Sequence, residues 1–185
     1  MATAARSFDN DANPDADSGE AVVVRFAGDS GDGMQLTGGQ FTLSSALSGN
    51  DFATFPDFPA EIRAPQGTTF GVSAFQINFG SSKISTAGDA PDVLVAMNPA
   101  ALMTNAGDLK PGGLIIADSG EFGARNLSKA GYTVNPLDDD SLSKWQVVHF
   151  DISQLTIEAV KPFGLGNKDA LRCKNMWTLG LALWM

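Results

Sequence analysis

The residues with the clearest chemical potential form a glycine-rich turn, GDSGDG, at positions 28–33. It follows an apolar run, AVVVRFA (21–27), and precedes a segment, MQLTGGQFTLSSALS (34–48), that can form a helix. Its three glycines allow positive φ angles and a close approach of the backbone to a ligand, and the start of the helix attracts negative charge. The turn can therefore bind an anion. Its G-x-x-G-x-G spacing matches the dinucleotide-binding pattern G-x-G-x-x-G poorly, so it indicates a fold more strongly than a ligand.

Other residue types that can carry out chemistry are scattered. Asp138, Asp139 and Asp140 are consecutive, so their side chains diverge, and no Glu or His completes a metal site; a solvated turn is expected. His149 lies within an apolar alternation without a nucleophile, which favours a core or surface histidine. The sequence therefore predicts no catalytic residue and no metal site.

A charged pair, Glu61 and Arg63, lies in the proline-rich loop PDFPAEIRAPQG at 56–67. Such a pair is usually an exposed ion pair that contributes little to stability. The alternative is that a partner or ligand uses these charges. The residues alone leave both readings open.

The elements that must position these residues follow a strand–helix order typical of an α/β domain. Apolar runs predict buried strands at 22–27, 92–98, 114–117 and 145–151. Asn98-Pro99 begins a helix that runs through Ala106, because proline suits the first helical turn. Ligands of open α/β sheets lie beyond the carboxyl ends of the strands. This rule places 28–33, Asn98 and 118–120 on one rim.

The other strands make the predicted sheet mixed but mainly parallel. One strand is expected at 51–55, before prolines that prevent regular structure from position 56 onward. The alternation at 68–79 predicts another strand, with a bulge near Ala74-Phe75. A short strand around Ile84 would return as an antiparallel edge. Residues 122–144 are expected to contain a short helix and a strand at 132–134.

Two predicted helices have unusual surfaces. In the first helix Leu36, Leu43 and Leu47 share one face, and the pair Gly38-Gly39 indicates close packing of a neighbouring backbone. Asn167 can cap a final helix that begins at Lys168. Two faces of the final helix carry large apolar residues: Met176, Leu179 and Leu183 on one, Trp177, Leu181 and Trp184 on the other. We expect further chain beyond Met185, or another subunit, to cover this helix.

Length and composition limit the number of domains, the classes of partner and the kinds of metal site that this chain can have. A chain of 185 residues with 43% apolar residues predicts one domain with a substantial core. The formal charge of −9 argues against nucleic acid as a partner, and residues 1–20 read as a disordered acidic tail. The single Cys173 excludes internal disulfides and any iron–sulfur or zinc site built from this chain's own thiolates. We see no signal peptide and no membrane-spanning run, so a cytoplasmic protein is expected.

Three stretches together resemble one enzyme family: GDSGDGMQLTGGQF (28–41), FPAEIRAPQGTTFGVSAFQINFG (58–80) and GNKDALRCKN (166–175). They are similar to the gamma-type domain of the 2-oxoacid:ferredoxin oxidoreductases, in the form fused to the front of the alpha subunit of 2-oxoglutarate:ferredoxin oxidoreductase. The middle stretch is the specific one, since glycine turns recur in many folds. The resemblance covers residues 21–185.

The resemblance implies a Rossmann-like three-layer α/β domain that belongs to a larger enzyme. The holoenzyme decarboxylates a 2-oxoacid on thiamine diphosphate with magnesium, passes electrons through iron–sulfur clusters to ferredoxin, and delivers the acyl group to coenzyme A. Other domains and a beta subunit hold those cofactors, so this chain is expected to be a truncated piece that is inactive alone. We expect Gly28, Ser30, Gly31 and Gly33, with Arg63, to contact phosphates of coenzyme A.

Two alternatives remain open at this point. One is a free-standing protein that binds NAD or a flavin, although its glycine spacing is wrong and Asp57 lies among prolines rather than at the usual position of the ribose-binding acid. The other is a purely structural interaction module that places a partner's active site without touching a ligand. Measuring whether the chain binds a cofactor or a partner protein would distinguish these two alternatives.

Overall fold

The computed structural model describes residues 21–61 and 64–185, so the predicted acidic tail at 1–20 lies outside the described residues. Six strands form one sheet in the order β2-β3-β1-β4-β5-β6. Their bounds are β1 Val22–Asp29, β2 Asp51–Asp57, β3 Val72–Gly80, β4 Val93–Ala96, β5 Leu114–Asp118 and β6 Gln146–Phe150. The strand β3 is antiparallel to both β1 and β2, whereas β1, β4, β5 and β6 are mutually parallel neighbours. The prediction of a mainly parallel mixed sheet is confirmed.

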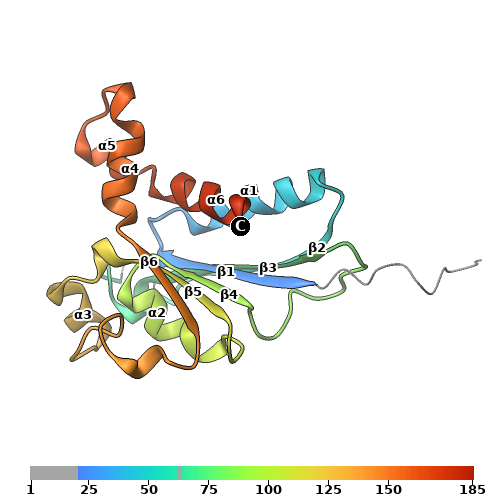
Figure 1. Ribbon diagram of the computed structural model, residues 1–185, viewed down its shortest axis with the longest axis horizontal. Coiled ribbons are helices and arrows are strands. Elements are labelled where there is room, and N and C mark those ends of the chain that lie inside the picture. Colours follow the sequence, from blue (N-terminus) through green and yellow to red (C-terminus); the bar gives the residue numbers. More distant parts are fainter. Residues whose placement is uncertain (1–20, 62–63) are drawn as a thin grey trace, which may run out of the picture.

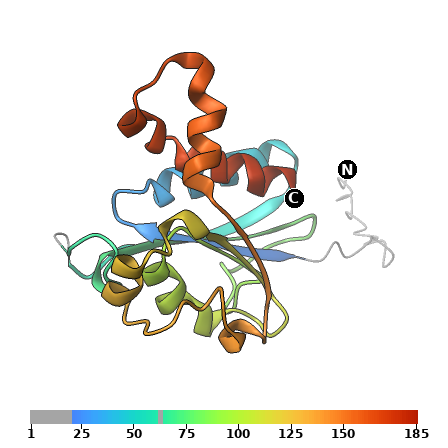
Figure 2. The same cartoon turned by 60° about the vertical axis from the view of Figure 1, so that its left-hand side comes forward.

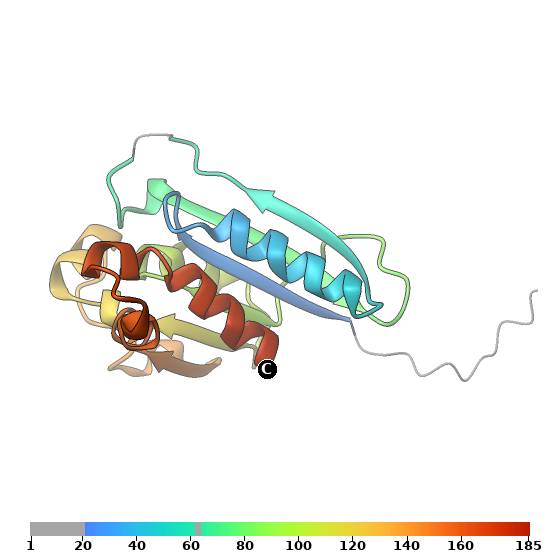
Figure 3. The same ribbon diagram turned by 90° about the horizontal axis from the view of Figure 1, so that it is seen from above.

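Helices cover both faces of this sheet and make three layers (Figure 1). On one face α1 (Met34–Leu47) and α6 (Lys174–Trp184) lie side by side, as the view from above shows (Figure 3). On the other face lie α2 (Pro99–Asn105) and α3 (Ala124–Ala130). The helices α4 (Ile152–Val160) and α5 (Asn167–Leu171) rise away from the sheet at one end (Figure 2). No described helix is long and apolar enough to cross a membrane.

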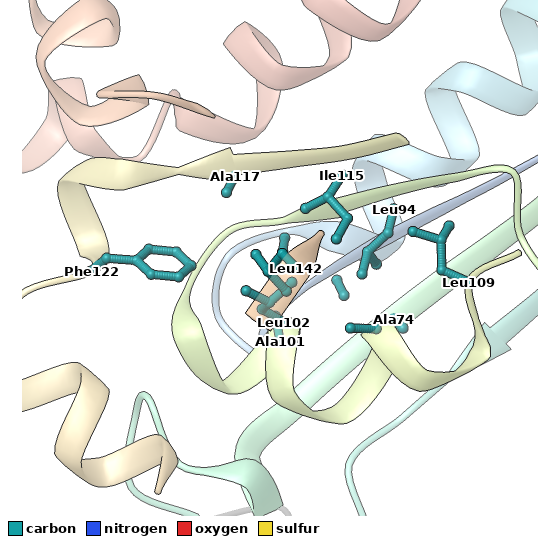
Figure 4. Packing of buried hydrophobic residues seen from close by; sticks show 12 residues of the cluster. Ala74, Leu94, Ala101, Leu102, Leu109, Ile115, Ala117, Phe122 and Leu142 are labelled. Carbon is teal, nitrogen blue, oxygen red and sulfur yellow. The ribbon is translucent and has the colours of Figure 1, made fainter. Parts of the chain in front are cut away.

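Each face of the sheet has its own apolar core. The α2 side packs Leu94 and Ile115 of the sheet against Leu102 of α2 and Phe122 beyond β5 (Figure 4). The α1–α6 side packs Phe26 and Ile77 against helix side chains such as Phe41, and the Phe26 and Phe41 ring centroids are 5.6 Å apart. Because both faces are covered, the central strands can be apolar on both sides.

This burial on two faces explains the pattern that suggested a bulge in the 68–79 strand. The register between β1 and β3 is continuous from Val22 opposite Phe79 to Asp29 opposite Val72, so the predicted bulge is wrong. Phe75 contributes to the core on the α1 side and Ala74 to the core on the α2 side. Residues 69–71, predicted as strand, form a single turn of 3-10 helix before β3.

The antiparallel strand was predicted in the wrong place. The segment around Ile84 is not a strand, because β3 is already paired on both sides by β1 and β2. Instead, the N–H of Ile84 donates to the carboxylate of Asp51 at 2.8 Å. Residues 132–134 are not a strand either. Pro56 lies inside β2, which tolerates it because β2 is an edge strand.

The helix α1 packs on the sheet through an unexpected face. Leu36, Leu43 and Leu47 point outward and are exposed, whereas Met34 and Phe41 are buried together with small residues of the same face. A Cβ at Gly38 would overlap the ring of Phe75, but Gly39 faces open space. The prediction of close packing at Gly38-Gly39 therefore holds at Gly38 alone, and the neighbour is a side chain rather than a backbone.

The carboxyl-terminal part contains more helices than predicted. The helix α4 had no sequence prediction, and its N-cap Asp151 accepts a hydrogen bond from the N–H of Gln154 at 2.8 Å. The predicted final helix is two helices, α5 and α6, with a break at Arg172 and Cys173, and Gly166 rather than Asn167 is the N-cap residue. In α6 the fully or nearly buried residues are Asn175 and Thr178, so its apolar side chains are only partly covered within this chain.

Candidate functional site

The carboxyl ends of three neighbouring parallel strands bring polar residues together on one rim, as predicted. Asp29 ends β1, Asn98 follows β4, and Asp118 ends β5. The Nδ2 of Asn98 donates to Oδ1 of Asp29 at 3.0 Å, so two of these residues are in direct contact. Asn98 also caps α2, because its Oδ1 accepts from the N–H of Ala101 at 2.8 Å.

The glycine turn closes on itself through its acidic residues. Oδ2 of Asp32 accepts from the N–H of Asp29 at 2.9 Å, and the N–H of Asp32 donates to the carbonyl oxygen of Asp29 at 2.9 Å. Gly33 is the N-cap of α1 and has a φ of +76°, which a residue with a side chain rarely adopts. The sequence therefore needs glycine here to turn the chain from β1 into α1.

A buried ion pair joins α6 to the rim. Nζ of Lys174 lies 2.7 Å from Oε1 of Glu121 and 3.1 Å from Oδ2 of Asp118, whose side chain is 0% exposed. Burial lowers the pKa of Lys174, but Asp118 and Glu121 outweigh it and raise that pKa, so the ammonium stays charged. Asp118 also accepts from the N–H of Ile152 at 3.0 Å, which ties the start of α4 to the same point.

Two cavities adjoin at this rim and share Asp32, Gln66, Glu121 and Lys174. The first, of about 270 Å³, extends toward α3 and is lined there by Arg125 and Lys129. The second, of about 490 Å³, extends toward α5 and is lined there by Lys168 and Arg172. Each cavity thus has carboxylates along the sheet and cations at its outer edge.

Three aspartates of the rim, Asp29, Asp32 and Asp118, have a pKa above the ordinary value for aspartate. Burial raises the pKa of Asp32 to about 6, and burial also raises the pKa of Asp29 against the opposing hydrogen bonds from Gly67 and Asn98. No group of three or more His, Cys, Asp or Glu side chains among residues 21–61 and 64–185 is arranged to hold a metal ion. The described arrangement can bind an anion at its cationic edge, and it offers no nucleophile paired with a base.

The predicted site residues occupy different places. Gly31 and Gly33 line the second cavity. Gly28 is buried, and a Cβ there would lie 3.0 Å from Oδ2 of Asp32 and 3.2 Å from Met97. Ser30 is exposed, and its N–H donates to the carbonyl oxygen of Gly71 at 3.0 Å. Arg63 lies outside the described residues, so its predicted role stays a prediction.

Sequence reasoning missed the charged side chains of the rim: Asp29, Asp32, Glu121, Arg125, Lys129, Lys168, Arg172 and Lys174. Asp29 and Asp32 stand between the glycines of the turn, and the last three lie in GNKDALRCKN. These charged residues within the two quoted stretches could have indicated a charged site. His149 and the three consecutive aspartates are exposed.

Comparison with known proteins shows the family to which this fold and rim belong. Residues 23–185 match the family model described as pyruvate ferredoxin/flavodoxin oxidoreductase. The chain belongs to this family. It is also 58% identical over 174 residues to 2-oxoglutarate oxidoreductase subunit KorA of Mycobacterium tuberculosis, a match that covers 94% of this chain and 27% of that protein. The resemblance stated from the sequence is confirmed.

Solved structures of the pyruvate ferredoxin/flavodoxin oxidoreductase family share the fold. A 2-oxoglutarate:ferredoxin oxidoreductase from Magnetococcus marinus, with 2-oxoglutarate, coenzyme A and succinyl-CoA bound, is 27% identical with a TM-score of 0.64, covering 87% of this chain and 23% of that one. The gamma subunit of a keto/oxoacid ferredoxin oxidoreductase from Geobacter sulfurreducens is 19% identical with a TM-score of 0.57, covering 86% of this chain and 73% of that one. The second likeness shows the fold alone.

The chain spans about a quarter of the length of the Mycobacterium tuberculosis protein. The part of that protein that it matches is the amino-terminal part. The matched region therefore corresponds to one domain of a longer oxidoreductase subunit.

Proposed function

We propose that this chain is the gamma-type domain of a 2-oxoglutarate:ferredoxin oxidoreductase. The observation that carries the proposal is the 58% identity over 174 residues with a 2-oxoglutarate oxidoreductase subunit. Such an enzyme converts 2-oxoglutarate and coenzyme A to an acyl-CoA and carbon dioxide and passes two electrons to ferredoxin. This domain contributes to the assembly and to the coenzyme A side of the enzyme, in a cytoplasmic setting.

The cofactors of that reaction belong to other parts of the enzyme in this proposal. A cluster bound by cysteines needs several thiolates, and this chain has one, Cys173. The remainder of the alpha subunit and a beta subunit would hold thiamine diphosphate, magnesium and the iron–sulfur cluster, and ferredoxin would bind to the assembled enzyme. The purified 185-residue chain should therefore show no oxidation of 2-oxoglutarate.

Coenzyme A binding is assigned to the second cavity. Gly31 and Gly33 offer backbone at the start of α1, and Lys168 and Arg172 supply positive charge at the outer edge. Among the described residues, Lys168 has no salt bridge, and Arg172 is paired only with the exposed Asp169 at 3.5 Å. Both cations are therefore available to the phosphate groups of coenzyme A. Arg63, which lies outside the described residues, is kept from the sequence analysis as a third phosphate contact.

The test is the affinity of the assembled enzyme for coenzyme A. Arg172→Ala and Arg63→Ala should each raise the KM for coenzyme A by at least about tenfold, since a charge-assisted hydrogen bond contributes about 1.5–3 kcal/mol. The KM for 2-oxoglutarate should stay unchanged. Lys83→Ala removes an exposed cation remote from the rim and serves as the matched control. An unchanged KM for coenzyme A in both arginine variants would remove these residues from the site.

A purely structural role remains the second candidate, because the outer helices leave much apolar surface uncovered. The large exposed apolar side chains of α1 and α6 are Leu36, Leu43, Leu47, Met176, Leu183 and Trp184, which we call the outer apolar surface. Such surfaces mark contacts with other protein. In the proposed enzyme the remainder of the alpha subunit covers it. If coenzyme A binding fails the test above, this assembly role alone would stand.

A further inference from the structure

Asp29 makes three contacts that join separate parts of the fold. Its Oδ1 and Oδ2 lie 3.1 and 2.9 Å from the N–H of Gly67, and Oδ1 also accepts from Nδ2 of Asn98 at 3.0 Å. Gly67 is 38 residues away along the chain. One carboxylate therefore connects the end of β1, the loop before β3 and the residue that caps α2.

The loop in question is the segment 64–71, from Ala64 to Gly71, which leads into β3. Gly67 has a φ of +72°, so the segment bends sharply at the residue that Asp29 contacts. Gln66 lines both cavities of the rim, and Gly67 lines the first. The position of this bend therefore determines part of the wall of the candidate site.

Two other contacts hold the segment, but they are placed differently. The N–H of Ser30 donates to the carbonyl oxygen of Gly71 at 3.0 Å, at the start of β3. Nζ of Lys129 donates to the carbonyl oxygen of Gln66 at 3.1 Å through a long, exposed side chain. Among the described residues, the Asp29 carboxylate alone accepts a hydrogen bond from the N–H at the bend.

We propose that Asp29 is a positioning residue that fastens segment 64–71 to the rim at Gly67, so that the neighbouring Gln66 forms part of the wall of the coenzyme A site. A carboxylate suits this role because both of its oxygens accept, whereas an amide would direct its NH₂ group at another donor. Only the effect on coenzyme A rests on the function proposed above. The contact itself can be tested without it.

The contact is tested on the wild-type chain by NMR. The amide proton of Gly67 should titrate with Asp29, with an apparent pKa above the ordinary value for aspartate, because burial raises the pKa of Asp29. The charged groups that face Asp29 are Asp32 and Glu121, which are acidic, and Lys129, which is basic. A Gly67 amide that does not respond to pH between 3 and 7 would overturn the proposal.

Hydrogen exchange provides the matched comparison. Asp29→Asn should speed exchange of the Gly67 amide at least tenfold at pH 7. Asp32→Asn removes the same charge three positions further along the turn. Asp32 accepts from the N–H of Asp29 rather than from the segment, so exchange at Gly67 should stay slow. Equal protection in wild type and Asp29→Asn would contradict the proposed contact.

The functional part is tested in the assembled enzyme. Asp29→Asn should raise the KM for coenzyme A about three- to tenfold, with kcat within twofold and the KM for 2-oxoglutarate unchanged. Asp51→Asn is the control. Asp51 likewise accepts from the N–H of a distant loop residue, Ile84, but it lies at the end of β2 that is farther from the rim. Faster exchange at Gly67 with an unchanged KM for coenzyme A would overturn the positioning role. If Arg172→Ala also leaves that KM unchanged, the coenzyme A assignment fails as well.

Discussion

Asp32 is a partly buried carboxylate whose one hydrogen-bond donor among the described residues is the backbone N–H of Asp29. Burial raises its pKa from 3.8 to about 6. The unfolded chain therefore releases this proton at lower pH than the folded chain does, and Asp32 lowers the free energy of unfolding as pH rises from about 4 to about 6. Above about pH 6 the Asp32 carboxyl is ionised in both states, and the loss of folding stability no longer grows with pH.

The variant Asp32→Asn should reverse this effect. Its amide oxygen can still accept from the N–H of Asp29, but it carries no charge to bury. We expect equal stability near pH 4 and a variant more stable than wild type by about 1–3 kcal/mol at pH 7.5, since one pKa unit is worth about 1.4 kcal/mol. Urea unfolding at the two pH values measures the difference. A variant less stable at pH 7.5 would contradict the account of Asp32.

Lys174 differs from the other cations of the rim because it lies in a buried ion pair. Lys174→Met would leave Asp118 buried without its counter-charge, at an expected cost of about 3–5 kcal/mol. Lys168→Met, on the exposed helix α5 of the same rim, should change stability by less than about 0.5 kcal/mol. Adding Asp118→Asn to Lys174→Met should recover part of the loss. Denaturant unfolding of the four proteins tests this, and equal effects of the two lysine variants would refute it.

At the scale of elements, two adjacent glycines of α1 provide a matched pair. Gly38→Ala would drive a methyl group into the ring of Phe75 in β3, with an expected loss of about 1–3 kcal/mol. Gly39→Ala meets nothing and should stabilise the helix by about 0.5–1 kcal/mol. Thermal unfolding of both variants provides the measurement. The interpretation fails if the two substitutions have effects of the same sign.

Local patterns predicted the strand–helix units well and long-range pairing poorly. The turn 28–33 and the Asn98-Pro99 helix start were predictable because caps and glycines act within a few residues. The absence of a strand at Ile84 was not predictable, because it depends on β2 pairing with the side of β3 that β1 leaves free. The helix α4 was missed although Asp151 and Gln154 carry a cap signal and Ile152, Leu155 and Ala159 recur at helical spacing, because nine residues give only a short pattern.

The candidate site was predictable in position but not in charge. The rule for open α/β sheets located the rim from the ends of β1, β4 and β5. The charged wall comes from residues far apart in the sequence, such as Glu121 and Lys174, which meet only when α6 lies along the sheet. The spacing of residues along the sequence does not show that Glu121 and Lys174 are in contact. The same holds for the contact between Asp29 and Gly67.

At the scale of the whole molecule, α1 and α6 lie side by side in one outer layer (Figure 3). Large apolar side chains lie on both sides of this layer. The inner side packs on the sheet, and on the outer side Leu47 is 81% and Trp184 is 84% exposed. Burying one large apolar side chain contributes about 1.5–3 kcal/mol. Several such side chains together can contribute substantially to the assembly that we propose with the remainder of an alpha subunit.

Charged substitutions on this surface should therefore separate folding from assembly. Leu43→Lys and Leu47→Lys should leave the stability of the 185-residue chain within about 0.5 kcal/mol, because both positions are exposed within it. If the remainder of the alpha subunit covers this surface, as we propose, the same changes would bury a charge in the full subunit, so we expect less assembled enzyme by size-exclusion chromatography. Val134→Lys, at another exposed residue in the turn after α3, should assemble normally. Normal assembly of the double leucine variant would show that this surface faces solvent in the enzyme, because a lysine ammonium placed in a closed protein interface without a partner would have destabilised it.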